Sequence, residues 1–216
     1  MDETRLFQHK IAAARRAWQI MRDPNVVFLD SETTGLHGAY FIELAIIDRT
    51  GKPLINQRLD PMAEIESGAI KVHGIQPWML VGQPRFYDIF EDVADVLAGK
   101  RLVIYNAQFD WNVLQSEITR TGHNPDFFAY RGISDMLKMR GPHCAMFIYA
   151  QFWGQWHDYY RNFTWQKLIL ACERFNVQVE APAHSAFGDS LRTLKVMEHM
   201  AHWYDGFSSQ YKELIS

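Results

Sequence analysis

Two short, uninterrupted apolar runs constrain the fold more than any other feature of the sequence. Residues 26–29 and residues 102–105 contain only aliphatic and aromatic side chains, which is typical of strands buried on both faces. A group of strands comes first along the chain, and helices then alternate with short strands. This order predicts an α/β fold in which a mixed sheet is flanked by helices.

The other expected elements follow from apolar spacing and from turn residues. A hairpin is expected over residues 40–48 and 54–59, because the turn residues 50–53 separate two runs rich in β-formers. Helical spacing predicts helices over residues 5–21, 86–97, 107–121, 165–175 and 185–203. The length of 216 residues favours a single domain over residues 1–216, with the N-terminal helix within residues 1–23 as an appendage.

Charge and cysteine content exclude several classes of protein. The net charge of -3 and the pI of about 6.3 do not predict a strongly basic surface, but an enzyme that grips few phosphates needs little of it. The two cysteines, Cys144 and Cys172, are too few for a disulfide framework or a four-thiolate metal site. The charged N-terminus and the lack of a long apolar run predict a cytoplasmic protein with no membrane partner.

Asp30 and Glu32 directly follow the first apolar run. Side chains two residues apart in an extended chain point to the same face, so these carboxylates would lie side by side. Two such charges 4 Å apart repel by about 4 kcal/mol at an effective dielectric constant of 20, so the pair favours a cation or a proton. Oxygen ligands suit Mg²⁺ or Mn²⁺. Alone, this pattern is more often a solvated turn.

Three further residues can join this pair. Asp110 lies in a helix that begins just after the second apolar run, although a first-turn aspartate also suits the helix dipole. His184 and Asp189 lie in a loop and in the first turns of the last expected helix, so both can face one pocket. A histidine beside such a cluster can act as a general base, although a lone histidine is more often structural.

In their order along the chain, these residues resemble the DEDDh-type 3′-to-5′ exonucleases of the RNase H-like superfamily. The resemblance covers residues 26–199 and rests on three motifs: residues 30–35 (DSETTG), residues 106–110 (NAQFD), and His184 with Asp189. Ser185 stands where a sister branch has tyrosine, which favours the branch with histidine. Tyr105 departs from the histidine that is common before the second motif.

The resemblance implies an RNase H-like fold and two divalent ions, Mg²⁺ or Mn²⁺, as cofactors. Asp30 would bridge both ions. Glu32 and Asp189 would hold the ion that carries the attacking water, and Asp110 would serve the second ion, directly or through water. His184 would take the proton of the water as general base. Paired ions polarise a phosphate and lower the pKa of bound water, so the chemistry of the residues agrees with these roles.

The resemblance also implies substrate contacts around the first two motifs. The backbone of Thr33, Thr34, Gly35 and Leu36 would meet the 3′ end, and Asn106 is expected at the same site. The side chains of Leu36 and His73 match positions that contact the terminal nucleotides. A core leucine and a turn histidine are the alternative interpretations.

An aromatic stretch over residues 147–165 separates the second and third motifs. Its side chains either pack over the core or stack on the bases of a single strand, because stacking grips nucleic acid without sequence preference. The candidates for stacking are Phe152, Trp153, Trp156, Tyr159 and Tyr160.

These features predict a metal-dependent exonuclease that acts on the 3′ end of a single-stranded nucleic acid, with DNA favoured over RNA, and releases nucleoside 5′-monophosphates. An exonuclease of RNA or of short oligoribonucleotides is an alternative, because no residue reads the 2′-hydroxyl group unambiguously. A non-catalytic module that binds 3′ ends is a second alternative. Loss of a metal ligand would be its signature, and all four carboxylates are present.

Overall fold

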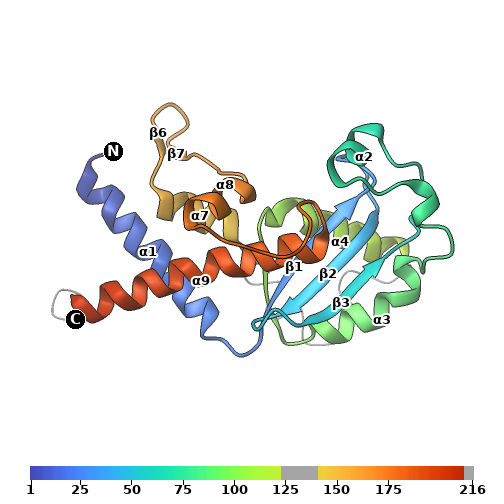
Figure 1. Cartoon of the computed structure of the whole chain (residues 1–216), viewed down its shortest axis with the longest axis horizontal. Coiled ribbons are helices and arrows are strands. Elements are labelled where there is room, and N and C mark those ends of the chain that lie inside the picture. Colours follow the sequence, from blue (N-terminus) through green and yellow to red (C-terminus); the bar gives the residue numbers. More distant parts are fainter. Residues whose placement is uncertain (123–140, 212–216) are drawn as a thin grey trace.

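The computed structural model describes residues 1–122 and 141–211, and its centre is a five-stranded mixed sheet in the order β3-β2-β1-β4-β5 (Figure 1). The strands are β1 (Val26–Thr33), β2 (Phe41–Asp48), β3 (Pro53–Arg58), β4 (Arg101–Ile104) and β5 (His143–Cys144). The strands β1, β2 and β3 pair antiparallel, whereas β1, β4 and β5 pair parallel. The expected mixed sheet is confirmed, and β1 is its middle strand.

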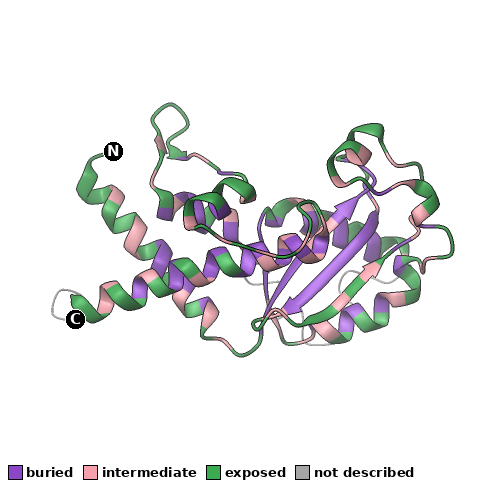
Figure 2. Ribbon diagram, viewed as in Figure 1, coloured by how far each residue is buried: buried purple, intermediate pink, exposed green. Residues whose placement is uncertain are grey.

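Helices cover both faces of the sheet, because the middle strand presents apolar side chains on both. Val26 and Phe28 of β1 belong to one core cluster, and Val27 and Leu29 belong to another. The first cluster includes side chains of α1 (Glu3–Met21), α7 (Ala145–Trp153), α8 (Leu168–Phe175) and α9 (Ala186–Gln210). The second includes side chains of α3 (Phe86–Leu97) and α4 (Ala107–Arg120). Residues 26–29 of β1 are all buried, as their purple colour in Figure 2 shows, and this burial explains why the run has no polar face.

Strand β1 is longer than the apolar run that predicts it. It continues through the first motif to Thr33, because β2 pairs with it there and sets Asp30 opposite Ala45 and Glu32 opposite Glu43. Pairing with β2, rather than apolar side chains, keeps this part of the chain extended. The first two acids therefore lie within the strand instead of after it.

Other boundaries differ where tertiary contacts decide them. The last helix runs to Gln210 rather than to residue 203, and the preceding helix begins at Leu168 rather than at residue 165. Several elements were not predicted: β5, α7, α2 (Ser67–His73), η1 (Pro77–Met79), and the hairpin of β6 (Trp156–His157) and β7 (Asn162–Phe163). Neither α2 nor η1 has a buried side chain, so neither produces a periodic apolar pattern.

Helix α1 crosses α9 and also packs against α7 (Figure 1). Its contact face contains the buried residues Ala13, Ala14, Ala17 and Ile20, and the small side chains of the three alanines let the helices approach closely. Its first turns are exposed (Figure 2). The single domain with this helix as an appendage stays a prediction. Among the described helices, none has both the length and the apolar character needed to cross a lipid bilayer.

Candidate active site

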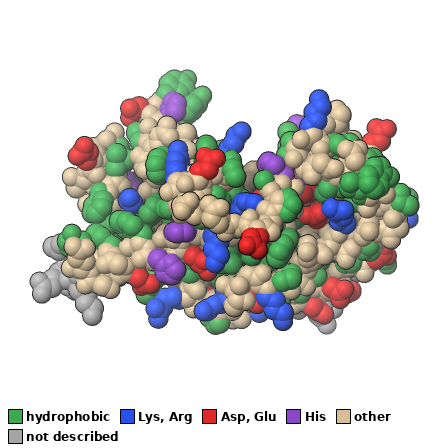
Figure 3. Space-filling model, viewed as in Figure 1, with side chains coloured by type: hydrophobic (Ala, Val, Ile, Leu, Met, Phe, Trp, Pro, Cys, Tyr) green, Lys and Arg blue, Asp and Glu red, His purple; other side chains and the backbone are tan. Residues whose placement is uncertain are grey.

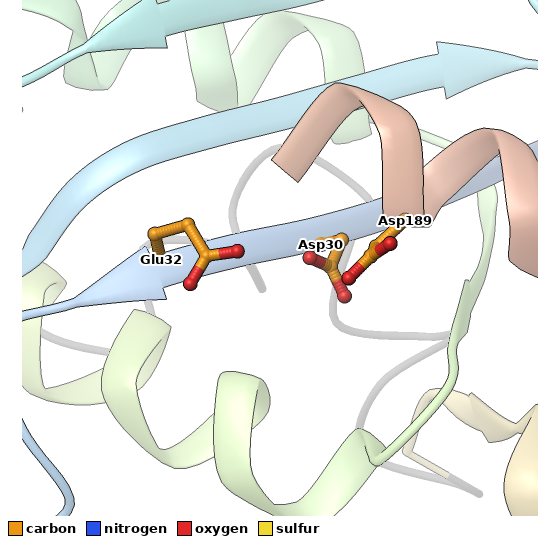
Figure 4. Close-up of side chains that lie close together, drawn as sticks. All are labelled: Asp30, Glu32 and Asp189. Carbon is orange, nitrogen blue, oxygen red and sulfur yellow. The ribbon is translucent and has the colours of Figure 1, made fainter. Parts of the chain in front are cut away.

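Three carboxylates meet where β1 passes the start of α9 (Figure 4). Asp30 and Glu32 lie two residues apart on β1, and Asp189 lies in the first turn of α9. One ligand oxygen atom from each residue lies within 4.8 Å of the other two. Strand periodicity thus brings two of the acids together, and the packing of α9 against β1 adds the third.

Burial and mutual repulsion raise the pKa values of these acids. The pKa of Asp30 is raised well above its usual range, first by burial and then by the charges of Asp110, Asp189 and Glu32. Burial and then the charge of Asp189 raise the pKa of Glu32 to about 8. Burial also raises the pKa of Asp189, although the guanidinium group of Arg192 opposes it. The cluster therefore favours protons or cations at neutral pH.

The thermal stability of the metal-free protein is expected to fall as the pH rises. A carboxyl group whose pKa is higher in the folded than in the unfolded chain favours folding while it is protonated, and this contribution is lost on deprotonation. For Glu32 the loss spans the range from its usual value of 4.5 to about 8, and Asp30 acts in the same direction. Melting curves recorded in chelator across this range will measure it, and saturating Mn²⁺ should flatten the dependence. A melting temperature that rises with pH would contradict the assignment.

Asp110 lies beside these three acids, in the first turn of α4. The residue is 5% exposed, and Ser31 Oγ donates a hydrogen bond to its Oδ1 at 2.6 Å. Among neighbouring charges, Asp110 contributes most to the raised pKa of Asp30, so the two carboxylates are close. Burial raises the pKa of Asp110 itself, against the opposing effect of the Ser31 hydrogen bond. The structure therefore brings all four predicted acids to one place.

His184 lies in the exposed loop that leads into α9, with its backbone in the left-handed region at a φ of 56°. Its charge acts on the carboxyl group of Asp189 and on the imidazole of His73, so it is close to both. His184 and Asp189 line the same groove, which has a volume of about 780 Å³. The predicted pairing of His184 with Asp189 at one pocket is thus present.

This groove also has basic and aromatic walls. Lys71 and Lys167 line it, and the indole ring of Trp165 is 55% exposed. The ring of Phe147 meets that of Trp165 edge to face, with 5.3 Å between centroids. Figure 3 shows a hollow on this face between the α2 and α8 sides of the molecule, with basic and histidine side chains near its rim.

The five aromatic residues predicted as candidates for base stacking lie outside this groove. Phe152 is buried, a guanidinium group lies 3.7 Å from the ring centre of Trp153, and Trp156 packs within the β6–β7 hairpin. The remaining two, Tyr159 and Tyr160, contact each other at the tip of that hairpin. Among the described residues of the aromatic stretch, Trp165 has the position that the stacking interpretation requires.

The chain is similar to known proteins in sequence and in fold. The model of the RNase_T family, described as exonuclease, matches residues 27–197. The chain belongs to this exonuclease family. The exonuclease is 32% identical over 189 residues to the uncharacterized exonuclease CP81 of Escherichia phage 186, a match that covers 87% of this chain and 93% of that protein.

The exonuclease is also similar to a second protein in sequence and to a solved structure in fold. It is 32% identical over 124 residues to the DNA polymerase III subunit epsilon of Pasteurella multocida. This match covers 52% of the chain and 49% of that subunit. The structure of Exonuclease X in complex with 5′ overhanging duplex DNA matches with a TM-score of 0.52 at 21% identity, over 82% of this chain and 93% of that one. The expected DEDDh family and RNase H-like fold are confirmed.

The loop of the exonuclease that follows β1 is held by its own side chains. Thr33 Oγ1 donates a hydrogen bond to the carbonyl oxygen of Gly35 at 2.8 Å, and Thr34 Oγ1 accepts one from the backbone N–H of Tyr40 at 3.0 Å. A Cβ atom at Gly35 would lie 2.2 Å from the carboxyl carbon of Glu66, so a larger residue there would have to displace this exposed side chain. Both threonine side chains already form hydrogen bonds within the loop. This agrees with the prediction that the backbone of the loop, rather than these side chains, contacts the 3′ end.

The other predicted substrate residues lie around the same site. Leu36 is 73% exposed, so the alternative of a core leucine is wrong. His73 ends α2, and its Nδ1 accepts a hydrogen bond from the backbone N–H of Ile75 at 2.9 Å, as a turn histidine does. Asn106 is exposed at the start of α4 and lines the groove. Contact of these residues with a nucleic acid stays a prediction.

Two charged residues that hold the site together were not predicted. Glu43 Oε1 accepts a hydrogen bond from the backbone N–H of Ala186 at 2.9 Å, which fixes the start of α9 to the sheet. The sequence feature that could have identified Glu43 is its charge within the otherwise apolar run of β2. Arg192 forms an ion pair with Asp189 at 3.0 Å. The sequence feature that could have identified Arg192 is its position three residues after Asp189 on a predicted helix, because this spacing places the two side chains on one side of the helix.

Proposed function

We propose that this exonuclease removes nucleotides from the 3′ end of single-stranded nucleic acid, with DNA favoured over RNA, and releases nucleoside 5′-monophosphates. The supporting observation is the meeting of Asp30, Glu32 and Asp189, the last of which lines a groove together with His184. A cytoplasmic location, as expected from the sequence, belongs to the same proposal.

The acidic cluster fits hard divalent cations, Mg²⁺ or Mn²⁺. Carboxylate oxygens are their preferred ligands, and a cation would relieve the repulsion that raises the pKa values of Asp30 and Glu32. Asp30, Glu32 and Asp189 would hold one ion, and Asp110 would serve a second together with Asp30. When bound, such ions polarise a phosphate and lower the pKa of a water molecule.

The residues of the chain would position the reacting groups around that centre. The imidazole of His184 would accept the proton of the attacking water, and its exposure lets it return that proton to solvent. The backbone of residues 33–36 would hold the terminal sugar, since the two threonine side chains of this loop are engaged within it. Asn106, which also lines the groove, would contact the terminal nucleotide.

The groove supports a single strand as the substrate. Lys71 and Lys167 can neutralise phosphates, and the exposed ring of Trp165 can stack on a base. The DNA in the Exonuclease X structure agrees with DNA as the substrate class.

Replacement of Trp165 by alanine is expected to raise the KM for a single-stranded oligonucleotide about tenfold, because stacking on one base contributes about 1–3 kcal/mol. The kcat should change little, since Trp165 is neither a proposed metal ligand nor the proposed general base. Steady-state kinetics will measure kcat and KM separately. The substrate is an unstructured single-stranded DNA that is just long enough to span the groove. Tyr87→Ala, an exposed aromatic residue on α3, is the matched control. An unchanged KM in Trp165→Ala would exclude this stacking contact.

Digestion of labelled substrates tests the proposed function. The wild-type protein is incubated with single-stranded DNA, duplex DNA or matched RNA, each labelled at either end, with Mg²⁺, Mn²⁺ or chelator. The proposal predicts metal-dependent release of labelled mononucleotide from the 3′-labelled single strand, and a ladder of shortened products from the 5′-labelled one. Faster digestion of RNA would favour the RNA exonuclease. Tight binding of 3′ ends without cleavage in either metal would favour the non-catalytic module.

A further inference from the structure

Arg192, in the second turn of α9, is a buried guanidinium group beside the carboxylate cluster. The residue is 9% exposed. Its Nη1 donates hydrogen bonds to Asp189 Oδ1 and to the carbonyl oxygen of Pro182, both at 3.0 Å, and its Nη2 donates one to the carbonyl oxygen of Ala181 at 2.6 Å. Burial of a charge is unfavourable unless it is paired in this way, so the side chain has little freedom to leave these partners.

The three acceptors belong to two parts of the proposed active site. Asp189 faces Asp30, and the carbonyl groups of Ala181 and Pro182 lie in the loop that carries His184. His184 has a left-handed backbone, which is unfavourable for a non-glycine residue and must be held by surrounding contacts. Arg192 supplies such contacts to the residues that come just before it.

The hydrogen bond to Asp189 also restricts how this carboxylate can bind a cation. Its Oδ1 accepts a hydrogen bond from the guanidinium group, which leaves this oxygen with fewer free lone-pair sites for a metal ion. A planar guanidinium group holds the directions of its hydrogen bonds more firmly than an ammonium group does.

The space around this contact admits no larger residue at Gly188. A Cβ atom there would lie 2.6 Å from the carbonyl oxygen of Pro182 and 2.7 Å from Arg192 Nη1. Loop, guanidinium group and helix therefore pack without spare room.

From these contacts, we propose that Arg192 is a positioning residue that fixes the Asp189 carboxylate for a cation and the His184 loop for proton transfer. This inference rests on the proposed metal-dependent function. Residues that orient metal ligands typically change metal affinity or activity by about 10–100-fold when replaced.

The test compares Arg192→Met, Arg192→Lys and a matched control, Arg120→Met. Arg120 makes a similar set of contacts away from the four acids: it donates hydrogen bonds to the carbonyl oxygens of Ala39 and Gly38 at 2.9 and 3.1 Å and pairs with Glu117 three residues earlier. Titration calorimetry with Mn²⁺ on the full chain, melting temperature, and kcat at saturating Mn²⁺ are measured for each protein.

We expect Arg192→Met to weaken Mn²⁺ binding about tenfold and to lower kcat about 10–100-fold, with Arg192→Lys intermediate because lysine keeps the charge but lacks the planar fork. Arg120→Met should bind Mn²⁺ as the wild type does, even if its melting temperature falls. Wild-type Mn²⁺ affinity and kcat in Arg192→Met would overturn the inference. Tighter Mn²⁺ binding in Arg192→Met would also overturn it, because it would indicate charge repulsion alone. If the wild type itself neither binds Mn²⁺ nor cleaves, the proposed function fails instead.

Discussion

Asp30→Asn is expected to lower exonuclease activity by about three orders of magnitude, while raising the melting temperature of the metal-free protein. Asp30 stands at the centre of the four acids and would bridge both cations, so its loss removes several kcal/mol of charge stabilisation from the transition state. In the absence of metal, burial and then the charges of the neighbouring carboxylates raise the pKa of Asp30. Removing its charge therefore relieves repulsion in the folded state.

The opposite signs of these two effects make the prediction specific. Activity is measured by release of 3′-terminal label with Mn²⁺, and stability by melting curves in chelator. Asp48→Asn is the matched control, because Asp48 lies on the neighbouring strand and accepts hydrogen bonds from Thr50 and Lys52 outside the site. The control should keep its activity and gain no stability. Full activity in Asp30→Asn, or lower stability together with lost activity, would contradict the assigned role.

His184→Asn is expected to lower kcat by about 10²–10⁴-fold, the usual contribution of a general base. Asparagine is chosen because it tolerates the left-handed backbone that residue 184 adopts better than alanine does. The proposed metal ligands stay in place, so calorimetry should show wild-type Mn²⁺ affinity.

His199→Gln provides the matched control for this variant. His199 is exposed on α9, where its ring stacks on that of Phe175 with 5.0 Å between centroids. This variant should retain wild-type kcat. A kcat within a factor of about two of the wild type in His184→Asn would exclude His184 as the general base.

Local patterns in the sequence predict those parts of the site that the backbone itself brings together. The two-residue period of a strand is enough to place Asp30 beside Glu32, and the apolar run before them identifies the middle strand. His184 and Asp189 are close in sequence, so any turn into a helix keeps them near one groove. The meeting of these two pairs depends on how α9 packs against β1, and no local pattern in the sequence encodes that packing. The expectation that the two pairs form one site came from the family resemblance.

Residues that act through tertiary contacts had weaker signals. Arg192 and Glu43 resemble ordinary helix and strand charges until the start of α9 is placed on the sheet. The aromatic stretch shows the same limit, because composition alone does not separate the packed ring of Phe152 from the groove-lining ring of Trp165. The length of β1 was underestimated because its second half is kept extended by pairing with β2.

The most direct test of the central claim is the position of bound metal. Crystals of the wild-type exonuclease grown with Mn²⁺ and a nucleoside 5′-monophosphate will give anomalous peaks at the manganese positions. The structure predicts one peak within about 2.2 Å of carboxylate oxygens from Asp30, Glu32 and Asp189, and a second on the side of Asp110. Peaks at other residues, or no peak between these carboxylates in a preparation that cleaves DNA, would contradict it.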